Sequence, residues 1–235
     1  MSCWDETVAS LGATSDLLGL LTDPDDPQQA AEAERLFLLT LASGWFTAFS
    51  DPDLPDFVPA VNTHLNCVGT NPDFIYGAAS IDGAGCYVLS GERGSGLFVH
   101  LDIVAGGLGV MEPLGPSIGT LDFDSLTLDQ NGGFSLLLSA ERPADWSGDW
   151  HRLDPAARSL SLRQACYDWG VGREARIAIE RTDKPHQPRQ WSAPEIAERL
   201  AALAAYPRRL AGMALGFIKS QRDKGLWNLL EHDDW

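Results

Sequence analysis

The sequence predicts an α+β protein: an antiparallel β-sandwich or half-barrel with helices before and after it. The first observation is a change in hydrophobic period, which shortens from the helical value to two near residue 73 and becomes helical again after about residue 192. The second is a series of short strand segments between these points, separated by turn residues and without intervening helices. We therefore expect a helical segment over 1–50, a β-sandwich core over 51–190 and helices over 191–235, within one compact domain.

The N-terminal region predicts a long helix and then an extended connector. Residues 27–49 read PQQAAEAERLFLLTLASGWFTAF, in which Pro27 suits a first helical turn and Ala, Glu and Leu fill the body. Residues 51–72 are rich in Pro, Asp and Asn, which favour turns and irregular backbone. The helix is expected to pack on another element.

The middle of the chain predicts strands. IYGAASIDGAGCYVLSG indicates two strands around an Asp82-Gly83 turn, and LTLDQNGGFSLLLS indicates a hairpin with Asn131-Gly132 at its tip. GERGSG, residues 91–96, is typical of a hairpin turn and lacks the Lys-Ser/Thr ending of a phosphate-binding loop. Further strands are predicted for GLFVHLDIV, SLSLRQACYDW and ARIAIER.

The C-terminal region predicts helices again. SAPEIAERLAALAAY begins with Ser192 as N-cap and Glu195 three residues later, and Pro207 is expected to interrupt the helix before RRLAGMALGFIKSQRD resumes it. The end of the chain carries much apolar area beside charged residues, which predicts a surface element or an oligomer contact: Leu215, Ile218, Leu226, Trp227, Leu229 and Leu230. A homo-oligomer formed through the C-terminal helices is therefore a prediction.

The charge balance excludes some classes of partner. The chain has 33 acidic and 17 basic residues and a formal net charge of −16. Such a field repels nucleic-acid phosphates and anionic membrane surfaces. The N-terminus lacks a secretory signal, and the apolar run from Leu36 to Phe49 is too short and too interrupted to span a bilayer. We therefore expect a cytoplasmic protein that binds neither nucleic acid nor membrane.

No cofactor or metal motif is evident in the sequence. The four cysteines, at positions 3, 67, 86 and 166, show neither CxxC pairing nor zinc spacing, and free, mostly buried thiols are expected. The sequence thus predicts chemistry without a bound cofactor.

Three segments in order carry a resemblance: NPDFIYGAASIDGAGCYVLSGERGSGLFVHLDI, DQNGGFSLLLSAERPADWSGDWHRLDP and SLSLRQACYDWGVGREARIAIER. The shared features are an Asn-Pro-Asp start, a turn of Gly-Arg-Gly type, an Asp-x-Asn-Gly hairpin, a Trp before the next strand and a closing Ile-Glu-Arg. Over about residues 55–220 the chain resembles bacterial proteins with the domain of unknown function 1214. The resemblance implies a β-sandwich and leaves the activity open.

His100 and Asp102 are candidates for acid–base chemistry. Two residues apart on a strand, they point to one face, and an imidazole beside a carboxylate can act as an oriented general base. The same pair could hold a metal if His64 or His151 added a ligand, although no spacing requires it. The third interpretation is a half-exposed strand face with His100 hydrogen-bonded to a neighbour.

Arg163 and Tyr167 are predicted to share one face of a central strand. Because both faces of SLSLRQACY are mostly apolar, we expect Arg163 to point inward and to be satisfied by an internal carboxylate or by an anionic group of a ligand. Tyr167 could then transfer a proton in the same pocket. The alternative is a structural salt bridge from Arg163 to Glu180 or Asp168.

Three more residues complete the predicted site. Tyr76 and His64 lie in or beside the connector, where loop residues can close over a ligand. Trp150 lies near a strand end and could form an aromatic wall, although core packing is the alternative.

Three classes of function remain open. The proton-transfer groups among apolar residues favour a cofactor-independent enzyme, a lyase, isomerase or hydrolase, that acts on a small apolar or aromatic metabolite in a pocket of the sandwich. The alternatives are a module that binds such a molecule without catalysis, and an accessory or assembly protein.

Overall fold

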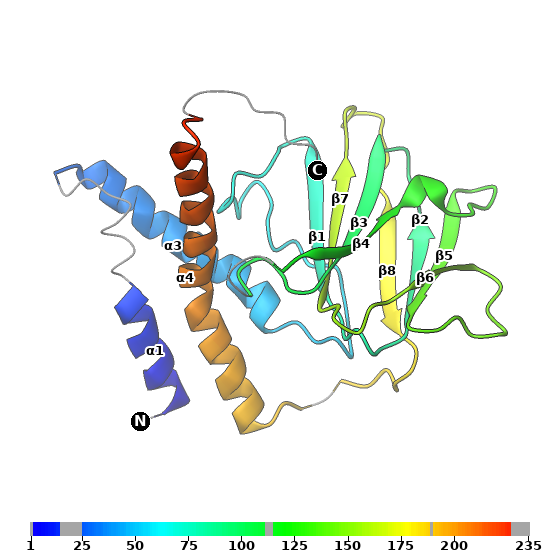
Figure 1. Ribbon diagram of the computed structural model, residues 1–235, viewed down its shortest axis with the longest axis horizontal. Coiled ribbons are helices and arrows are strands. Elements are labelled where there is room, and N and C mark those ends of the chain that lie inside the picture. Colours follow the sequence, from blue (N-terminus) through cyan, green and yellow to red (C-terminus); the bar gives the residue numbers. More distant parts are fainter. Residues whose placement is uncertain (1, 15–24, 111–114, 189, 227–235) are drawn as a thin grey trace.

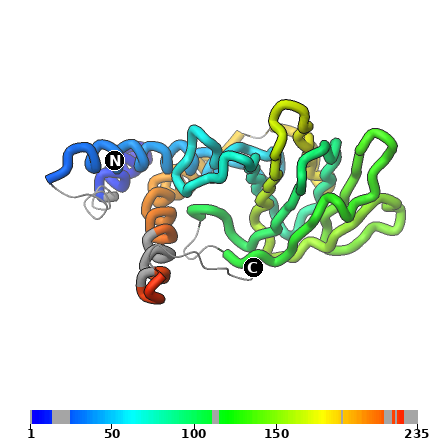
Figure 2. The backbone as a smooth tube through the Cα atoms, turned by 90° about the horizontal axis from the view of Figure 1, so that it is seen from above, coloured from blue at the N-terminus to red at the C-terminus, as the bar shows by residue number. Residues whose placement is uncertain are grey.

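The β-sandwich lies at one end of the molecule and the helices at the other (Figure 1; Figure 2). The computed structural model describes residues 2–14, 25–110, 115–188 and 190–226, with backbone only for 215–219 and 222. The helices in the described residues are α1 (Cys3–Thr14), α3 (Pro27–Ala48) and α4 (Ala193–Asp223), and a short 3-10 turn, η1, spans Phe123–Ser125. The predicted α+β class with flanking helices is confirmed.

Two four-stranded sheets form the sandwich. Sheet 1 is antiparallel throughout and has the order β1 (Phe74–Ser80), β7 (Ser159–Ala165), β3 (Phe98–Val104), β4 (Ser117–Asp122). Sheet 2 has the order β6 (Asp149–Arg152), β5 (Gly133–Ser139), β2 (Tyr87–Glu92), β8 (Arg176–Arg181). Its pairs are antiparallel except β5 with β6, which run parallel.

The hydrophobic core lies between the two sheets. Alternate residues of each strand point into it, as the period of two requires. Sheet 1 contributes Leu101 and Leu162, sheet 2 contributes Leu89 and Leu136, and all of these are almost fully buried. The other face of sheet 1 is therefore free to build a site.

The turn after β1 does not form the predicted hairpin. β1 and β2 lie in different sheets, so the chain around Asp82 and Gly83 crosses between the sheets. A Cβ atom on Gly83 would lie 2.4 Å from the backbone oxygen of Asp154, so this crossing needs glycine. The predicted turn at residues 91–96 likewise begins at the end of β2 in sheet 2 and leads to β3 in sheet 1. A hairpin turn and a connection between two sheets use the same kinds of turn residue. Only the strands with which the flanking strands pair distinguish the two.

The turn at Asn131-Gly132 leads into β5 without a strand before it, so the predicted hairpin is wrong here too. The Asp129 carboxylate accepts hydrogen bonds from the backbone N–H groups of Asn131 and Gly133, at 2.7 and 2.8 Å, and Gly132 has a φ of 80°. This capped turn is stable locally and does not need a hairpin partner.

The helices begin where the sequence predicts. Asp26 accepts hydrogen bonds from the N–H groups of Gln28 and Gln29 and so caps α3 ahead of Pro27. Ser192 and Glu195 form a reciprocal capping box at the start of α4.

Pro207 does not interrupt α4, which runs unbroken from Ala193 to Asp223. A proline inside a helix costs about 3 kcal/mol, because one hydrogen bond is lost and the ring crowds the preceding turn. Its neighbours Tyr206 and Leu210 are almost fully buried, and the Tyr206 hydroxyl lies 3.1 Å from Ser43 Oγ of α3. Burial of this helix face against α3 offsets the local cost.

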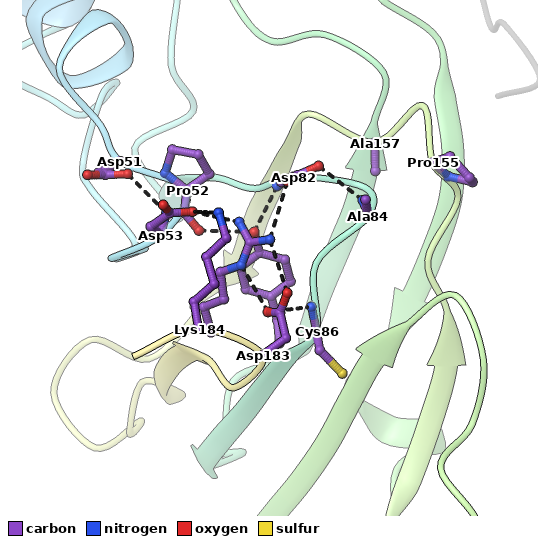
Figure 3. A network of polar contacts seen from close by, with 12 residues as sticks. Asp51, Pro52, Asp53, Asp82, Ala84, Cys86, Pro155, Ala157, Asp183 and Lys184 are labelled. Atoms are coloured by element: carbon purple, nitrogen blue, oxygen red, sulfur yellow. Dashed lines mark hydrogen bonds and ion pairs between the residues drawn. The ribbon is translucent and has the colours of Figure 1, made fainter. Parts of the chain in front are cut away.

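A buried arginine ties the connector to the sandwich (Figure 3). The Arg181 side chain of β8 is only 3% exposed and forms ion pairs with Asp53 at 2.7 Å, Asp183 at 2.9 Å and Asp82 at 3.3 Å. Its guanidinium lies 5.5 Å from the centroid of the Tyr87 ring, and the Tyr87 hydroxyl donates to Pro52 O. Burial raises the pKa of Tyr87 to about 12. The network fixes where the connector leaves α3 and reaches sheet 1.

Within the described residues, no helix combines the length and the apolar character needed to cross a membrane. Trp227, Leu229 and Leu230, which contribute to the predicted oligomer contact, lie outside the described residues, as do the side chains of Leu215 and Ile218. Oligomerisation through the C-terminal helices stays a prediction.

Candidate functional site

Strand pairing brings several predicted site residues together on the outer face of sheet 1. Tyr76 of β1 lies opposite Arg163 of β7, which lies opposite His100 of β3. The next row on the same face contains Ala78, Ser161, Asp102 and Thr120. Residues distant in sequence thus form one polar surface.

His100 and Asp102 point to the same face as predicted, but the acid beside the imidazole is a different one. His100 Nε2 lies 3.6 Å from Asp122 Oδ2, and its ring centroid is 4.8 Å from that of Phe98. Asp102 instead accepts hydrogen bonds from Thr120 Oγ1 at 3.0 Å and Arg163 Nη2 at 3.1 Å. Asp102 therefore holds Arg163, and Asp122 is the residue placed to orient His100.

The prediction that Arg163 points inward is wrong. β7 is a central strand as expected, but its core-facing residues are Leu160, Leu162 and Gln164, so Arg163 falls on the outer face and its side chain is 50% exposed. Its partner is Asp102 and neither Glu180 nor Asp168. The outer-face positions of β7 are Ser159, Ser161, Arg163 and Ala165, so the strand has one apolar face and one mostly polar face.

Three predicted residues are not brought into this surface. β7 ends at Ala165, so Tyr167 lies beyond the strand and is 73% exposed. His64 is exposed in the connector, where its backbone N–H donates to Asn62 Oδ1. Trp150 belongs to β6 of sheet 2, and its indole Nε1 donates to Ser139 Oγ at 2.9 Å. The sequence overestimated the length of β7 and could not assign Trp150 to a sheet.

A cavity of about 320 Å³ lies against the outer face of sheet 1, next to the polar surface. Its floor is formed by β1 and the start of β7, and its walls come from the end of α3, the connector and the loop after β3. The wall residues include Phe46, Thr47, Val58, Ala60, Val61, Gly106, Gly107, Leu108 and Val110. The lining is mostly apolar, as is usual for a small-molecule site.

Small side chains create this space. The outward positions of the floor are Ala78, Ser80, Ser159 and Ser161, where larger residues would fill the gap between sheet and helix. Ser80 is hydrogen-bonded to Ser50, two residues after the end of α3, and Ser159 donates to Gly106 O at 2.6 Å. The serines thus anchor two walls to the floor while leaving volume between them.

Tyr76 connects the cavity with the polar surface. It lines the cavity, and its hydroxyl accepts a hydrogen bond from the Asn71 N–H at 3.1 Å. Among the predicted site residues Tyr76 alone belongs to the lining, whereas His100, Asp102 and Arg163 stand beside it.

A second cavity of about 370 Å³ adjoins the first and shares Thr47 and Val110 with it. It lies along α4, whose Arg199 donates to Ala48 O and Ser50 O, at 2.9 and 2.7 Å, while Arg209 donates to Val110 O at 2.8 Å. α4 therefore holds two walls of the first cavity in place.

Apart from Tyr76, the residues that build the first cavity were missed by sequence reasoning. Their one sequence signal is the run of small residues at alternate positions, 78 and 80 in one strand and 159 and 161 in another. This signal acquires meaning only when the two strands are known to be neighbours.

No group of three or more His, Cys, Asp or Glu side chains in the described part of the chain is arranged to hold a metal ion. The cysteines in this part are free, and Cys166 is the buried one.

Comparison with known proteins supports the fold. Neither the models of known protein families nor the curated proteins gave a match, so the resemblance to the domain of unknown function 1214 stays a prediction. An uncharacterized protein from Burkholderia cenocepacia has a similar structure, with a TM-score of 0.84 and 23% identity over 94% of this chain. This chain spans 61% of that protein's length.

A weaker match is the VPA0106 protein from Vibrio parahaemolyticus, with a TM-score of 0.39 and 14% identity over 73% of this chain and 51% of that one. At 23% identity the likeness to the Burkholderia cenocepacia protein concerns the fold alone.

Proposed function

We propose that this protein binds a small apolar or aromatic molecule in the cavity on the outer face of sheet 1. The observation that carries the proposal is the lining: small and apolar side chains from four separate segments surround about 320 Å³ of space. Ligand pockets in proteins typically begin at about 300 Å³ and are largely apolar with a few polar groups. Burial of an apolar ligand there is favoured by about 25 cal/mol for each Å² removed from water.

The walls support binding because they are held without a ligand. Serine hydroxyls tie α3 and the loop after β3 to the floor, and the arginines of α4 hold Ala48, Ser50 and Val110 from behind. A cavity kept open by hydrogen bonds in its walls loses little conformational entropy when a ligand enters. We expect this binding to take place in the cytoplasm.

Filling the cavity tests the proposal. Ala78 lies on the floor, and Ala78→Phe would place a ring where the ligand sits. We expect octanol, used as a neutral apolar probe, to bind the unaltered protein and to bind Ala78→Phe at least about tenfold more weakly. Saturation-transfer NMR with titration measures both affinities.

The matched control is Thr120→Phe. Thr120 lies in the same row of sheet 1 as Ala78 but on the opposite edge strand, outside the cavity. Its substitution should leave octanol binding unchanged. If octanol fails to bind, or binds equally well to Ala78→Phe, the proposed function is wrong. If octanol binds as expected, native mass spectrometry of freshly purified protein identifies the natural ligand.

A cofactor-independent enzyme acting on the same kind of molecule is the second candidate. It is favoured by Tyr76, which lines the cavity and lies in one row with Arg163 and His100. A tyrosine hydroxyl and an imidazole can both transfer protons. His100 and Asp102 do not line the cavity, so a reacting group would have to reach its rim.

Metabolite depletion in a cell extract separates the two candidates. An enzyme would consume a compound that Tyr76→Phe and His100→Ala leave untouched. A binding protein would deplete its ligand only in proportion to its own concentration, and heating would return the ligand unchanged.

A further inference from the structure

The charge of the cavity lining is opposite to that of the whole chain. The protein has 33 acidic and 17 basic residues, yet among the described residues the lining contains one basic residue, Arg158, and no acidic one. An acidic surface with an acid-free cavity indicates selection for a ligand that is neutral or negative at its polar end. A carboxylate in the lining would exclude such a ligand by repulsion and desolvation.

Arg158 is held in place at the edge of this cavity. Its Nη1 donates to Pro155 O at 2.9 Å and to Ala157 O at 2.7 Å. Its backbone N–H donates to Val104 O, and its carbonyl accepts from the Ile81 N–H. Backbone and guanidinium are therefore both fixed, and an already ordered arginine loses little rotamer entropy when it binds an anion.

Part of the Arg158 guanidinium remains available. Within the described part of the chain, the side-chain hydrogen bonds of Arg158 are made by Nη1, and Nε and Nη2 donate to no group there. An arginine presents its donors as a planar fork that matches a carboxylate. Ser159 follows directly, and it also lines the cavity.

The size of the cavity limits the apolar part of the ligand. At roughly 30 Å³ for each group of the size of a water molecule, 320 Å³ holds about ten such groups. A medium-length acyl chain or a single substituted aromatic ring fits this space, whereas a long lipid chain does not.

From these observations we propose that the ligand is a medium-chain or aromatic carboxylic acid, bound as its anion, with the carboxylate at Arg158 and the apolar body over β1 and β7. This inference rests on the proposed function and adds the charge, size and orientation of the ligand. The polar end lies at the edge, where the carboxylate keeps part of its hydration, and the apolar end reaches toward Val58 and Leu108.

A pair of probes that differ only at the polar end tests this inference. Octanoate should bind the unaltered protein at least about tenfold more tightly than octanol, because a charge-assisted hydrogen bond is stronger than a neutral one. Arg158→Gln keeps a polar side chain, although a shorter one, and removes the charge. It should weaken octanoate binding at least about tenfold and leave octanol binding within about twofold. Isothermal titration calorimetry gives both constants.

The control is Arg152→Gln, which removes an exposed arginine from β6 of sheet 2, away from the cavity. It should not change the affinity for either probe. Thermal melting of each variant shows whether it is folded, and unchanged octanol binding by Arg158→Gln shows in addition that its cavity is intact.

Each contrary outcome has a distinct meaning. If octanol and octanoate bind equally, or Arg158→Gln binds octanoate normally, the carboxylate assignment is wrong while apolar binding stands. If Arg163→Gln rather than Arg158→Gln abolishes the preference for octanoate, the anion lies at the polar surface and the assignment to Arg158 is wrong. If neither probe binds, the proposed function itself fails.

Discussion

Arg163 lies on β7, between β1 and β3, and the face of the strand to which its side chain points decides its environment. The residues before and after it point into the core, so its guanidinium emerges on the outer face beside Asp102. A half-exposed ion pair of this kind contributes up to about 1 kcal/mol, because water screens the charges and the side chains lose entropy. The pair positions Asp102 more than it stabilises the fold.

Arg163→Gln should therefore change stability only slightly. We expect the midpoint of thermal unfolding to fall by less than about 4 °C, which corresponds to about 1 kcal/mol in a chain of this size. Differential scanning calorimetry at low and high salt provides the test, since screening should reduce the small difference further. A decrease of 10 °C or more, on the order of a buried-pair deletion, would show that Arg163 is buried after all.

Close contact between α3 and α4 depends on one glycine. Gly44 of α3 faces the ring of Tyr206, whose Cγ would lie 2.7 Å from a Cβ atom at position 44. The hydroxyl of the same tyrosine is bonded to Ser43, and burial raises the pKa of Tyr206. The tyrosine thus has little room to withdraw.

Gly44→Ala should destabilise the protein by about 1–3 kcal/mol, since either the ring or the helix has to move. Gly12→Ala in α1 is the matched control: a Cβ atom there meets no atom of the described residues within 4 Å, so the higher helix propensity of alanine should stabilise by about 0.5–1 kcal/mol. Urea unfolding of both variants measures the two free energies. Equal effects of the two substitutions would mean that α3 and α4 pack more loosely than described.

The Arg181 network links three parts of the molecule: the connector, the crossing from β1 to β2 and the end of β8 (Figure 3). The Ala84 N–H, with a further contribution from Arg181, lowers the pKa of Asp82. Burial alone would raise the pKa of Asp183, but hydrogen bonds from Arg181 and the Cys86 N–H outweigh it and lower that pKa. Both carboxylates are more acidic in the folded state than in the unfolded chain.

Stability should consequently depend on pH in the acid range. A carboxyl group whose pKa is lowered on folding stabilises the protein above its unfolded pKa, near 3.9, and this contribution is lost as the pH falls through the folded value. We expect a plateau above about pH 5 and a loss of stability below about pH 4. Asp82→Asn and Asp183→Asn should each lower the melting temperature on the plateau. Each should also weaken the decrease of the melting temperature with falling pH below about pH 4.

Asp145→Asn is the control for the loss of stability at acid pH, because Asp145 is an exposed residue outside the network. Its pH profile should follow that of the unaltered protein. If the Asp82 and Asp183 variants keep the full acid dependence, the network does not control acid stability.

The class of the fold and the order of its elements can be predicted from local sequence patterns. The change of period near residue 73, the caps at Ser192 and Glu195, and the strands around residues 100, 162 and 179 all follow from local chemistry, because caps and alternation act over a few residues. The sequence also identified Tyr76, His100 and Arg163 as candidate site residues, and strand pairing places these three side by side on sheet 1.

Which strands are neighbours follows from long-range packing, and the candidate site depends on this pairing. A turn signal is the same whether the next strand pairs with the previous one or crosses to the other sheet, so the turns at Asp82-Gly83 and at residues 91–96 proved to be crossings. The same holds for Arg163, whose face depends on which side the core lies, and for Pro207, whose local cost is offset by burial against α3. The cavity forms because Ala78 lies opposite Ser161 and Ser80 lies opposite Ser159 in the paired strands. The residues of each pair are separated by about eighty positions in the sequence, and a local sequence pattern does not reveal contacts of that range.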